Sequence, residues 1–267
     1  MLTGYFDESG TASTEQLCIV AGFVGNEAQW NGFIGDWIPA LGHHRKNLHM
    51  TKLRWNRRYD KIVSDLARLG PIPHRYNLAP VRIGIWHRDF NELMKGKISE
   101  TFANPYIICA VASVAVVMDE IAAPTDEVMF IFDRQEGRRA KAMEILHQTV
   151  FKFAKMDRRV KDIDFRPRHS TVCLDPADYL AFEAREYGID STSKKAQAAM
   201  PIAIADKGYG GILTREQVED IANHYIEHGM VPGGVRKMSD QLAGALLKAG
   251  WTHSSIAKWK EKVWDAQ

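Results

Sequence analysis

Three aspartates in this sequence lie at positions where reactive groups are commonly found. Asp7 follows a short apolar segment, and Asp133 closes the apolar run 128–132. Asp178 lies in the first turn of a helix that the Asp-Pro pair at 175–176 predicts. Strand ends and helix starts are where an α/β sheet presents its functional groups. The placement is therefore compatible with three carboxylates that meet at one site.

Carboxylates that meet at one site have a defined chemistry. They repel one another and lose hydration unless a cation lies between them. Ligands that are all oxygen suit Mg²⁺ or Mn²⁺, which retain waters and bind substrate phosphates. Two such ions about 4 Å apart activate a water molecule and stabilise the leaving oxygen when a phosphodiester is hydrolysed. A site shared by Asp7, Asp133 and Asp178 would thus predict metal-dependent phosphodiester chemistry.

Each aspartate also has an ordinary structural explanation. Asp7 fits an Asx-turn, and Asp133 fits an ion pair with Arg134 or Arg138 at the end of a strand. Asp178 fits a first-turn carboxylate that the helix dipole stabilises. Spacing alone therefore does not establish the site.

A basic stretch that contains a tryptophan runs from residue 43 to residue 58. Such a stretch is typical of a surface that follows a phosphate backbone and stacks a base on the Trp55 ring. A solvated surface loop explains the composition equally well. His49 fits a group that assists a leaving oxygen or holds a phosphate, and it also fits a structural hydrogen bond. The candidate nucleic-acid contacts are Arg45, Lys46, His49, Lys52 and Arg54.

The order of apolar segments predicts an α/β fold with a mixed sheet flanked by helices, because early paired strands are followed by alternating helix and strand. Strands are expected near residues 1–6, 17–24, 78–86, 127–132 and 164–174. Helices are expected near residues 26–41, 58–69, 104–121, 136–156 and 175–187, the second within a helical insertion.

The chain changes character after Gly188. Residues 191–200 are small and polar, which is typical of a linker. We therefore divide the chain into a domain over residues 1–190 and a C-terminal helical appendage over residues 200–267. Apolar residues at helical spacing in the last segment favour packing over DNA reading. Helices are expected near residues 215–228, 239–249 and 254–263.

Composition excludes several classes of protein. The 267 residues are 45% hydrophobic and carry a net charge of +2, which neither requires nor excludes nucleic acid as a partner. The three cysteines are far apart and form no CxxC pair, so a zinc ribbon and a thioredoxin-type site are excluded. Cysteines without a disulfide framework suit a reducing compartment.

Membrane and export signals are also missing from the sequence. The longest apolar run, residues 107–118, is shorter than the roughly 20 residues that span a bilayer. The first residues lack the basic start of a signal peptide and turn acidic almost at once. We therefore expect a cytoplasmic protein that does not insert into a membrane.

Several short motifs resemble one protein family. They are YFDESG at 5–10, VAGFV at 20–24, Trp30, Trp37, LHM at 48–50, FIFDR at 130–134 and ADYLA at 177–181. Together they are similar to the family catalogued as domain of unknown function 3800, which is found in bacteria and their phages. The resemblance covers roughly residues 1–187. One departure is Asp175, which stands where family members often have glutamine, so it either adds charge to the site or caps the helix.

The resemblance implies a ribonuclease H-like fold with an acidic metal site. Carried over position by position, Asp7, Asp133 and Asp178 become catalytic metal ligands for Mg²⁺ or Mn²⁺. Glu8 is a further catalytic candidate, although strand alternation points it to the face opposite Asp7 unless the turn at residues 9–10 brings it back.

Two functions follow from this reading. The first is a metal-dependent nuclease that hydrolyses phosphodiester bonds of DNA or RNA. The alternative is a non-catalytic ribonuclease H-like binding or partner module, such as a phage-defence or antitoxin-like component, because a fold and its acidic residues do not prove turnover.

Overall fold

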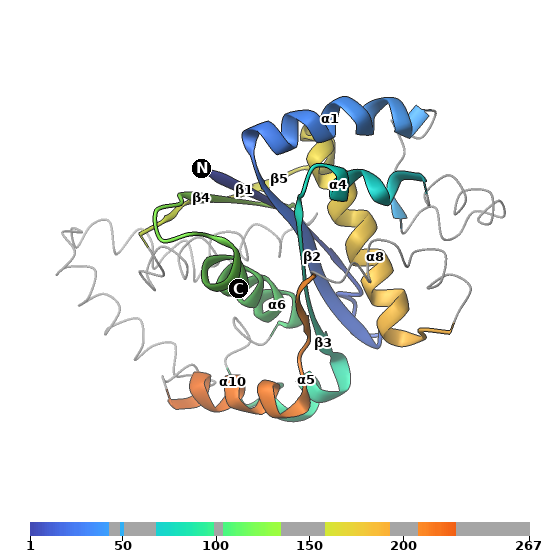
Figure 1. The fold of residues 1–267 in the computed structure, drawn as a ribbon. Helices are drawn as coiled ribbons and strands as arrows, with labels where there is room; N and C mark the ends of the chain where they lie inside the picture. The colour runs from blue at the N-terminus through green and yellow to red at the C-terminus, as the bar shows by residue number, and fades with distance from the viewer. Residues whose placement is uncertain (43–48, 51–67, 99–103, 135–157, 193–207, 228–267) are drawn as a thin grey trace.

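A mixed sheet forms the centre of the protein in a computed structural model that describes residues 1–42, 49–50, 68–98, 104–134, 158–192 and 208–227 (Figure 1). Its strands in the described part are β1 (Leu2–Ser9), β2 (Leu17–Asn26), β3 (Ala79–Trp86), β4 (Val128–Asp133), β5 (Val160–Arg166) and β6 (Tyr209–Ile212). The helices there are α1 (Glu27–Leu41), α4 (Pro71–Arg75), α5 (His87–Leu93), α6 (Pro105–Val116), α8 (Asp175–Ile189) and α10 (Arg215–Glu227).

The strands of this described sheet are ordered β5-β4-β1-β2-β3-β6. β2 runs antiparallel to its neighbours β1 and β3, whereas β4, β5 and β6 each pair in parallel with the strand beside them. The predicted α/β class with a mixed sheet is confirmed. In the parallel pairing of β1 and β4, Phe6 lies opposite Phe132. The next residues, Asp7 and Asp133, therefore lie side by side on neighbouring strands, towards the carboxyl ends of β1 and β4.

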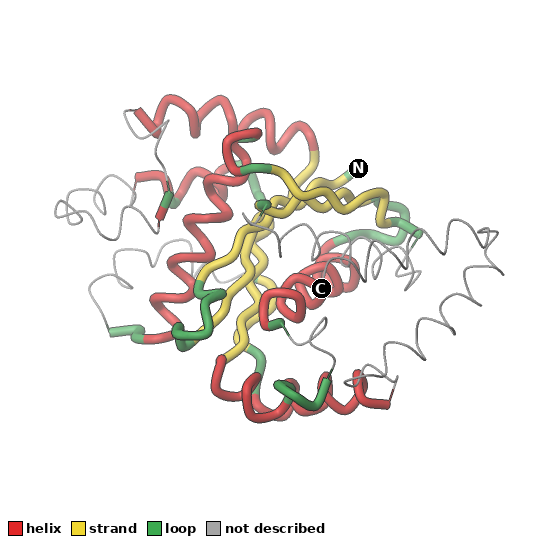
Figure 2. Tube along the Cα trace, turned by 180° about the vertical axis from the view of Figure 1, so that it is seen from behind, coloured by secondary structure: helices red, strands yellow, loops and turns green. Residues whose placement is uncertain are grey.

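Helices cover both faces of the sheet, as opposite views show (Figures 1 and 2). The residues of β2 alternate between two apolar clusters because successive side chains of a strand point to opposite faces. Val20 belongs to the cluster with α6, and Ala21 belongs to the cluster with α1 and α8. Both faces are buried, so β2 reads as an almost continuous apolar run.

Helix α1 follows the predicted local signals closely. The Asn26 side chain accepts a hydrogen bond from the Gln29 N–H at 3.0 Å, and the Gln29 side chain accepts one from the Asn26 N–H at 2.7 Å. This reciprocal capping box satisfies two backbone donors at the start of the helix. Trp30, Phe33 and Trp37 then recur at helical spacing and are buried.

Strand β5 ends earlier than the sequence predicts. The expected strand covers residues 164–174, whereas β5 stops at Arg166 and is followed by Pro167 and short 3₁₀ turns at Arg168–Ser170 and Val172–Leu174. Proline lacks a backbone N–H and cannot continue the strand pairing. The consequence is local but important, because Arg168 leaves the sheet in a turn.

The stretch after residue 200 is not wholly helical. Tyr209–Ile212 forms β6, which pairs in parallel with β3, so this part of the expected helical appendage is a strand of the central sheet. Helix α10 lies where a helix is predicted, with Val218 and Ala222 buried in the α6-side cluster. Two paired glycines and only four residues give β6 a weak sequence signal. The helices expected at 239–249 and 254–263 lie outside the described residues.

The helical insertion is described only at its end. The expected helix at 58–69 falls almost entirely outside the described residues, and α4 occupies Pro71–Arg75, just after the expected end of that helix. Proline at the first position of a helix is tolerated because its missing N–H would have had no partner. Across the described ranges, no helix is both long and apolar enough to cross a bilayer.

Candidate metal centre

Asp7 and Asp133 come from adjacent strands in the middle of the sheet. Asp7 lies near the end of β1 and is only 2% exposed. Asp133 is the last residue of β4. The cross-strand partner of Asp7 is Ala21, which faces α8, so the Asp7 side chain points to the same side.

Asp178 reaches Asp7 and Asp133 from helix α8, which covers one face of the sheet. It lies in the first turn of α8, which packs against β1 and β2, and it is 4% exposed. Its Oδ2 atom accepts a hydrogen bond from the Met50 N–H at 2.8 Å. This hydrogen bond fixes the orientation of the Asp178 carboxylate at the start of the helix.

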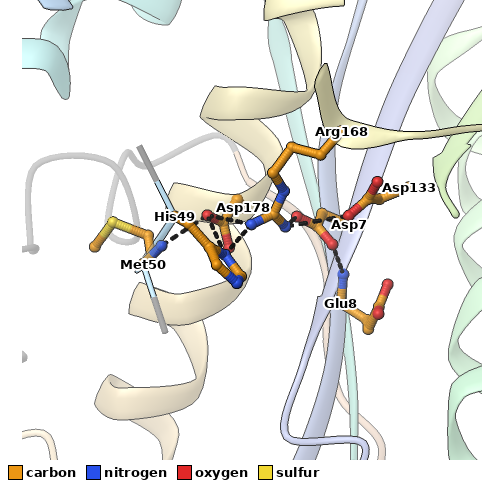
Figure 3. A network of polar contacts seen from close by, with 7 residues as sticks. All are labelled: Asp7, Glu8, His49, Met50, Asp133, Arg168 and Asp178. Atoms are coloured by element: carbon orange, nitrogen blue, oxygen red, sulfur yellow. Dashed lines mark hydrogen bonds and ion pairs between the residues drawn. The ribbon is translucent and has the colours of Figure 1, made fainter. Parts of the chain in front are cut away.

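The Arg168 guanidinium lies between the three carboxylates (Figure 3). Its Nη2 bonds to Asp7 Oδ2 and lies 3.2 Å from Asp133 Oδ2. Its Nη1 donates to Asp178 Oδ2 at 3.0 Å. The structure therefore brings the three predicted aspartates together around one positive charge.

His49 is the other candidate that the structure places at this centre. Its Nδ1 contacts Arg168 Nη1 and lies 3.6 Å from Asp178 Oδ2. The side chain is 34% exposed, so it stands at the rim rather than in the core. The remaining basic candidates, Arg45, Lys46, Lys52 and Arg54, lie outside the described residues.

Glu8 lies beside Asp7 in sequence but on the other face of the sheet. Its cross-strand partner is Val20, which belongs to the cluster with α6. The Glu8 N–H donates to Asp7 Oδ1 at 2.7 Å, so its backbone rather than its side chain supports the cluster. Figure 3 shows the Glu8 carboxylate turned away from Arg168. Strand alternation thus decides its position.

The buried cluster shifts the proton affinity of its members. Burial raises the pKa of Asp7 well above its ordinary value, and the nearby Glu8 carboxylate adds to the rise, while Arg168 opposes it. Burial also raises the pKa of Asp133, again against the effect of Arg168. Burial alone would lower the pKa of Arg168, but the three aspartates reverse this and raise it. The guanidinium therefore stays charged and offsets part of the repulsion.

The donor set has the chemistry that a hard divalent cation requires. All three side chains offer oxygen, and Asp133 Oδ1 is buried without a hydrogen-bond partner among the described residues. A cation, the guanidinium, already stands where the carboxylates converge. With Arg168 between the aspartates, no group of three or more His, Cys, Asp or Glu in the described ranges is arranged to bind a metal ion. The residue types fit such an ion once that space is open.

Arg168 is the member of the site that the sequence reasoning missed. Residues 164–174 read as a strand, which hides any reason to place Arg168 beside Asp7, 161 residues away. The available signal is Pro167. A proline ends β5 directly after Arg166, which pairs with Asp133, so the turn that follows begins close to Asp133.

Comparisons with known proteins did not assign this chain to a family. No protein-family model, curated protein or solved structure was found to match this chain.

Asp175 lies one turn before Asp178 and provides a test of the local electrostatics. It is the first residue of α8 rather than its N-cap, and no side chain among the described residues caps this helix, so the structure does not show the capping role suggested by sequence. Burial raises the pKa of Asp175 from 3.8 to about 7. A raised pKa means that the folded protein holds the proton more tightly than the unfolded chain, so stability falls as pH rises from about 4 to about 7.

We expect Asp175→Asn, measured in EDTA, to remove this pH dependence. Below pH 4 the variant and the wild type should unfold alike, and above pH 7 the variant should be more stable by up to about 4 kcal/mol. Urea unfolding at pH 4, 6 and 8 measures the difference. Asp162→Asn, at an exposed aspartate on β5, controls for the loss of one charge. Equal pH slopes for Asp175→Asn and the wild type would contradict the prediction.

Proposed function

We propose that this protein is a divalent-metal-dependent nuclease. The observation that carries the proposal is the convergence of Asp7, Asp133 and Asp178, from β1, β4 and α8, on one position that a positive charge fills. Buried carboxylates cluster in this way at a cost in repulsion and desolvation. A divalent ion bound by the three carboxylates would offset this repulsion and could also bind a substrate phosphate.

The proposal includes a ribonuclease H-like core and membership of the family of domain of unknown function 3800. The order β5-β4-β1-β2-β3, in which only β2 is antiparallel, supports this assignment, because it is also the strand order of the ribonuclease H fold. Acidic residues at the ends of the two central strands and in the helix after β5 are also compatible with it. A reducing, cytoplasmic location belongs to the same proposal.

Each residue of the site would have a separate role. Asp7, Asp133 and Asp178 would hold Mg²⁺ or Mn²⁺, which when bound supplies Lewis-acid stabilisation of the charge that develops on a phosphodiester. The Met50 N–H fixes the Asp178 carboxylate, and the surrounding burial excludes water from the Asp7 side. His49, at the rim, would contact a substrate phosphate or move a proton.

The substrate in this proposal is DNA or RNA. In this proposal, the basic stretch at residues 43–58 would neutralise the phosphates of a bound strand. The candidates for this contact besides His49 are Arg45, Lys46, Lys52 and Arg54, which lie outside the described residues.

One observation favours the second candidate function, a binding or partner module without turnover. Arg168 already offsets part of the carboxylate charge, and the raised pKa values of Asp7 and Asp133 relieve more of it by proton binding, so a purely structural cluster can persist without a metal ion. Such a protein would keep the fold and bind its partner without cleaving it.

A cleavage assay separates the two functions. The purified full chain, incubated with end-labelled single- and double-stranded DNA and RNA, is expected to cut at least one substrate with Mn²⁺ or Mg²⁺ and none with EDTA, because the ion supplies the charge stabilisation. Gel analysis of the products gives the readout. Intact substrates across the panel with both ions would favour the partner module.

A further inference from the structure

The Arg168 guanidinium stands in the space that the proposed metal ion would need. Its Nη2 contacts both Asp7 and Asp133, and its Nη1 donates to Asp178 Oδ2 at 3.0 Å. Mg²⁺ binds carboxylate oxygen at about 2.1 Å. An ion placed at that distance from Asp178 Oδ2 toward the arginine would lie only about 1 Å from Nη1. The guanidinium and the ion therefore exclude each other from this position.

Charge favours the exchange of one cation for the other. Three carboxylates face the gap, and Arg168 brings a single positive charge to them. A divalent ion brings two charges to the same place, and its bonds of about 2.1 Å are shorter than the contacts of Arg168 with Asp178 at 3.0 Å and with Asp133 at 3.2 Å. The carboxylates thus retain an attraction for a metal ion that the arginine does not fully satisfy.

The contacts of Arg168 are incomplete in a way that allows it to leave. Its Nε is buried without a hydrogen-bond partner among the described residues, and Asp133 Oδ1 is in the same condition. A buried polar group without a partner lowers the stability of the arrangement that contains it. The residue also lies in a short 3₁₀ turn after β5 rather than in a strand, and its side chain is 13% exposed, so it reaches the surface at one edge.

We propose that Arg168 is an internal cation that holds the three aspartates together in the metal-free protein and is displaced when a divalent metal binds. The inference rests on the proposed metal site and adds a competitor to it. Arg168 is then a positioning residue whose removal changes the metal-free and metal-bound states in opposite directions. It stabilises the empty cluster and weakens the binding of the ion.

Titration of the full chain with MnCl₂ tests this competition. By isothermal calorimetry, Arg168→Gln is expected to bind Mn²⁺ at least about tenfold more tightly than the wild type, since the charged hydrogen bonds that the ion must break are gone. In EDTA the same variant should melt at a lower temperature, because the carboxylates lose their counter-charge. The rise in melting temperature on adding Mn²⁺ should be larger than in the wild type.

Two further variants make the test specific. Arg166→Gln removes the same charge two residues earlier, from a side chain that pairs with Asp164 at 2.7 Å, and should leave Mn²⁺ affinity close to that of the wild type. Arg168→Lys keeps the charge but lacks the planar fork that bonds several carboxylates at once. Its Mn²⁺ affinity should lie between those of the wild type and Arg168→Gln. It also replaces Arg168→Gln in the comparison if that variant fails to fold.

The outcomes separate this inference from the proposed function. If the wild type binds Mn²⁺ and Arg168→Gln binds it no more tightly, Arg168 does not compete with the ion, and the metal site remains without it. An equal gain in Arg166→Gln would assign the effect to long-range charge and overturn the inference as well. Binding by Arg168→Gln alone would support the competition strongly. Absence of Mn²⁺ binding in every variant would overturn both the metal site and the role of Arg168.

Discussion

Replacing Asp133 with asparagine is expected to abolish metal-dependent cleavage while the fold is retained. The change keeps the shape of the side chain and removes one of three ligand charges. Asp133 is the last residue of β4, and its Oδ1 has no hydrogen-bond partner among the described residues, so this atom is available to a metal ion. We expect a loss of at least about 1000-fold in rate, equivalent to about 4 kcal/mol of transition-state stabilisation.

The measurement compares purified variants on whichever substrate the wild type cuts, at saturating Mn²⁺. Asp164→Asn is the matched control, because Asp164 lies on the neighbouring strand β5 and pairs with Arg166 outside the cluster. It should cleave like the wild type. The melting temperature of Asp133→Asn in EDTA should be unchanged or higher, since repulsion with Asp7 and Asp178 decreases. Wild-type cleavage rates in Asp133→Asn would assign the activity to another site.

Truncating Phe6 to alanine is expected to cause the largest loss of stability among these variants. Phe6 is fully buried next to Asp7, and its ring lies 5.3 Å from the Phe132 ring and 6.1 Å from the Phe130 ring. A side-chain carbon added at Gly22 would come within 2.7 Å of the Phe6 ring, so the ring fills the space above that glycine. Emptying such a position costs about 3–5 kcal/mol, a large part of the roughly 5–15 kcal/mol that stabilise a typical domain.

Urea unfolding followed by tryptophan fluorescence measures this loss as a lower midpoint. Phe6→Leu provides the comparison, because leucine refills part of the space and should cost less. The rings of Phe6, Phe132 and Phe165 stack in a row across β1, β4 and β5, and Phe6 and Phe132 directly precede Asp7 and Asp133. The folded fraction of Phe6→Ala should therefore bind Mn²⁺ more weakly. A loss of less than about 1 kcal/mol in Phe6→Ala would mean that the ring is not tightly packed.

Local signals in the sequence determined most of the elements in the described part. The Asn26 and Gln29 side chains begin α1 with a capping box, and the Asn104 side chain accepts from the Tyr106 N–H at 2.9 Å at the start of α6. Continuous apolar residues produced β2 and β4, because both faces of those strands are covered. These signals involve residues within a few positions of one another, so they can be read without knowing the fold.

The same local signals placed the three aspartates at the ends of elements. Asp133 ends β4, Asp7 lies two residues before the end of β1, and Asp178 lies in the first turn of a helix. The catalytic role expected for Glu8 required the turn at residues 9–10 to bring its side chain back, but β1 continues to Ser9 and alternation along the strand places Glu8 on the face opposite Asp7. Sequence therefore supplied the members of the cluster that depend on strand and helix periodicity.

Only the tertiary structure decided what stands between those aspartates. Arg168 reaches Asp7 across 161 residues of chain because β5 pairs with β4 and stops at Arg166. Likewise, Tyr209–Ile212 becomes a strand only because the edge of β3 offers it parallel hydrogen-bond partners. Both features depend on which distant segments lie side by side, and strand pairing is set by packing and neighbours more than by local preference. The sequence thus determined the carboxylates, and the packing of the sheet determined the cation that they share.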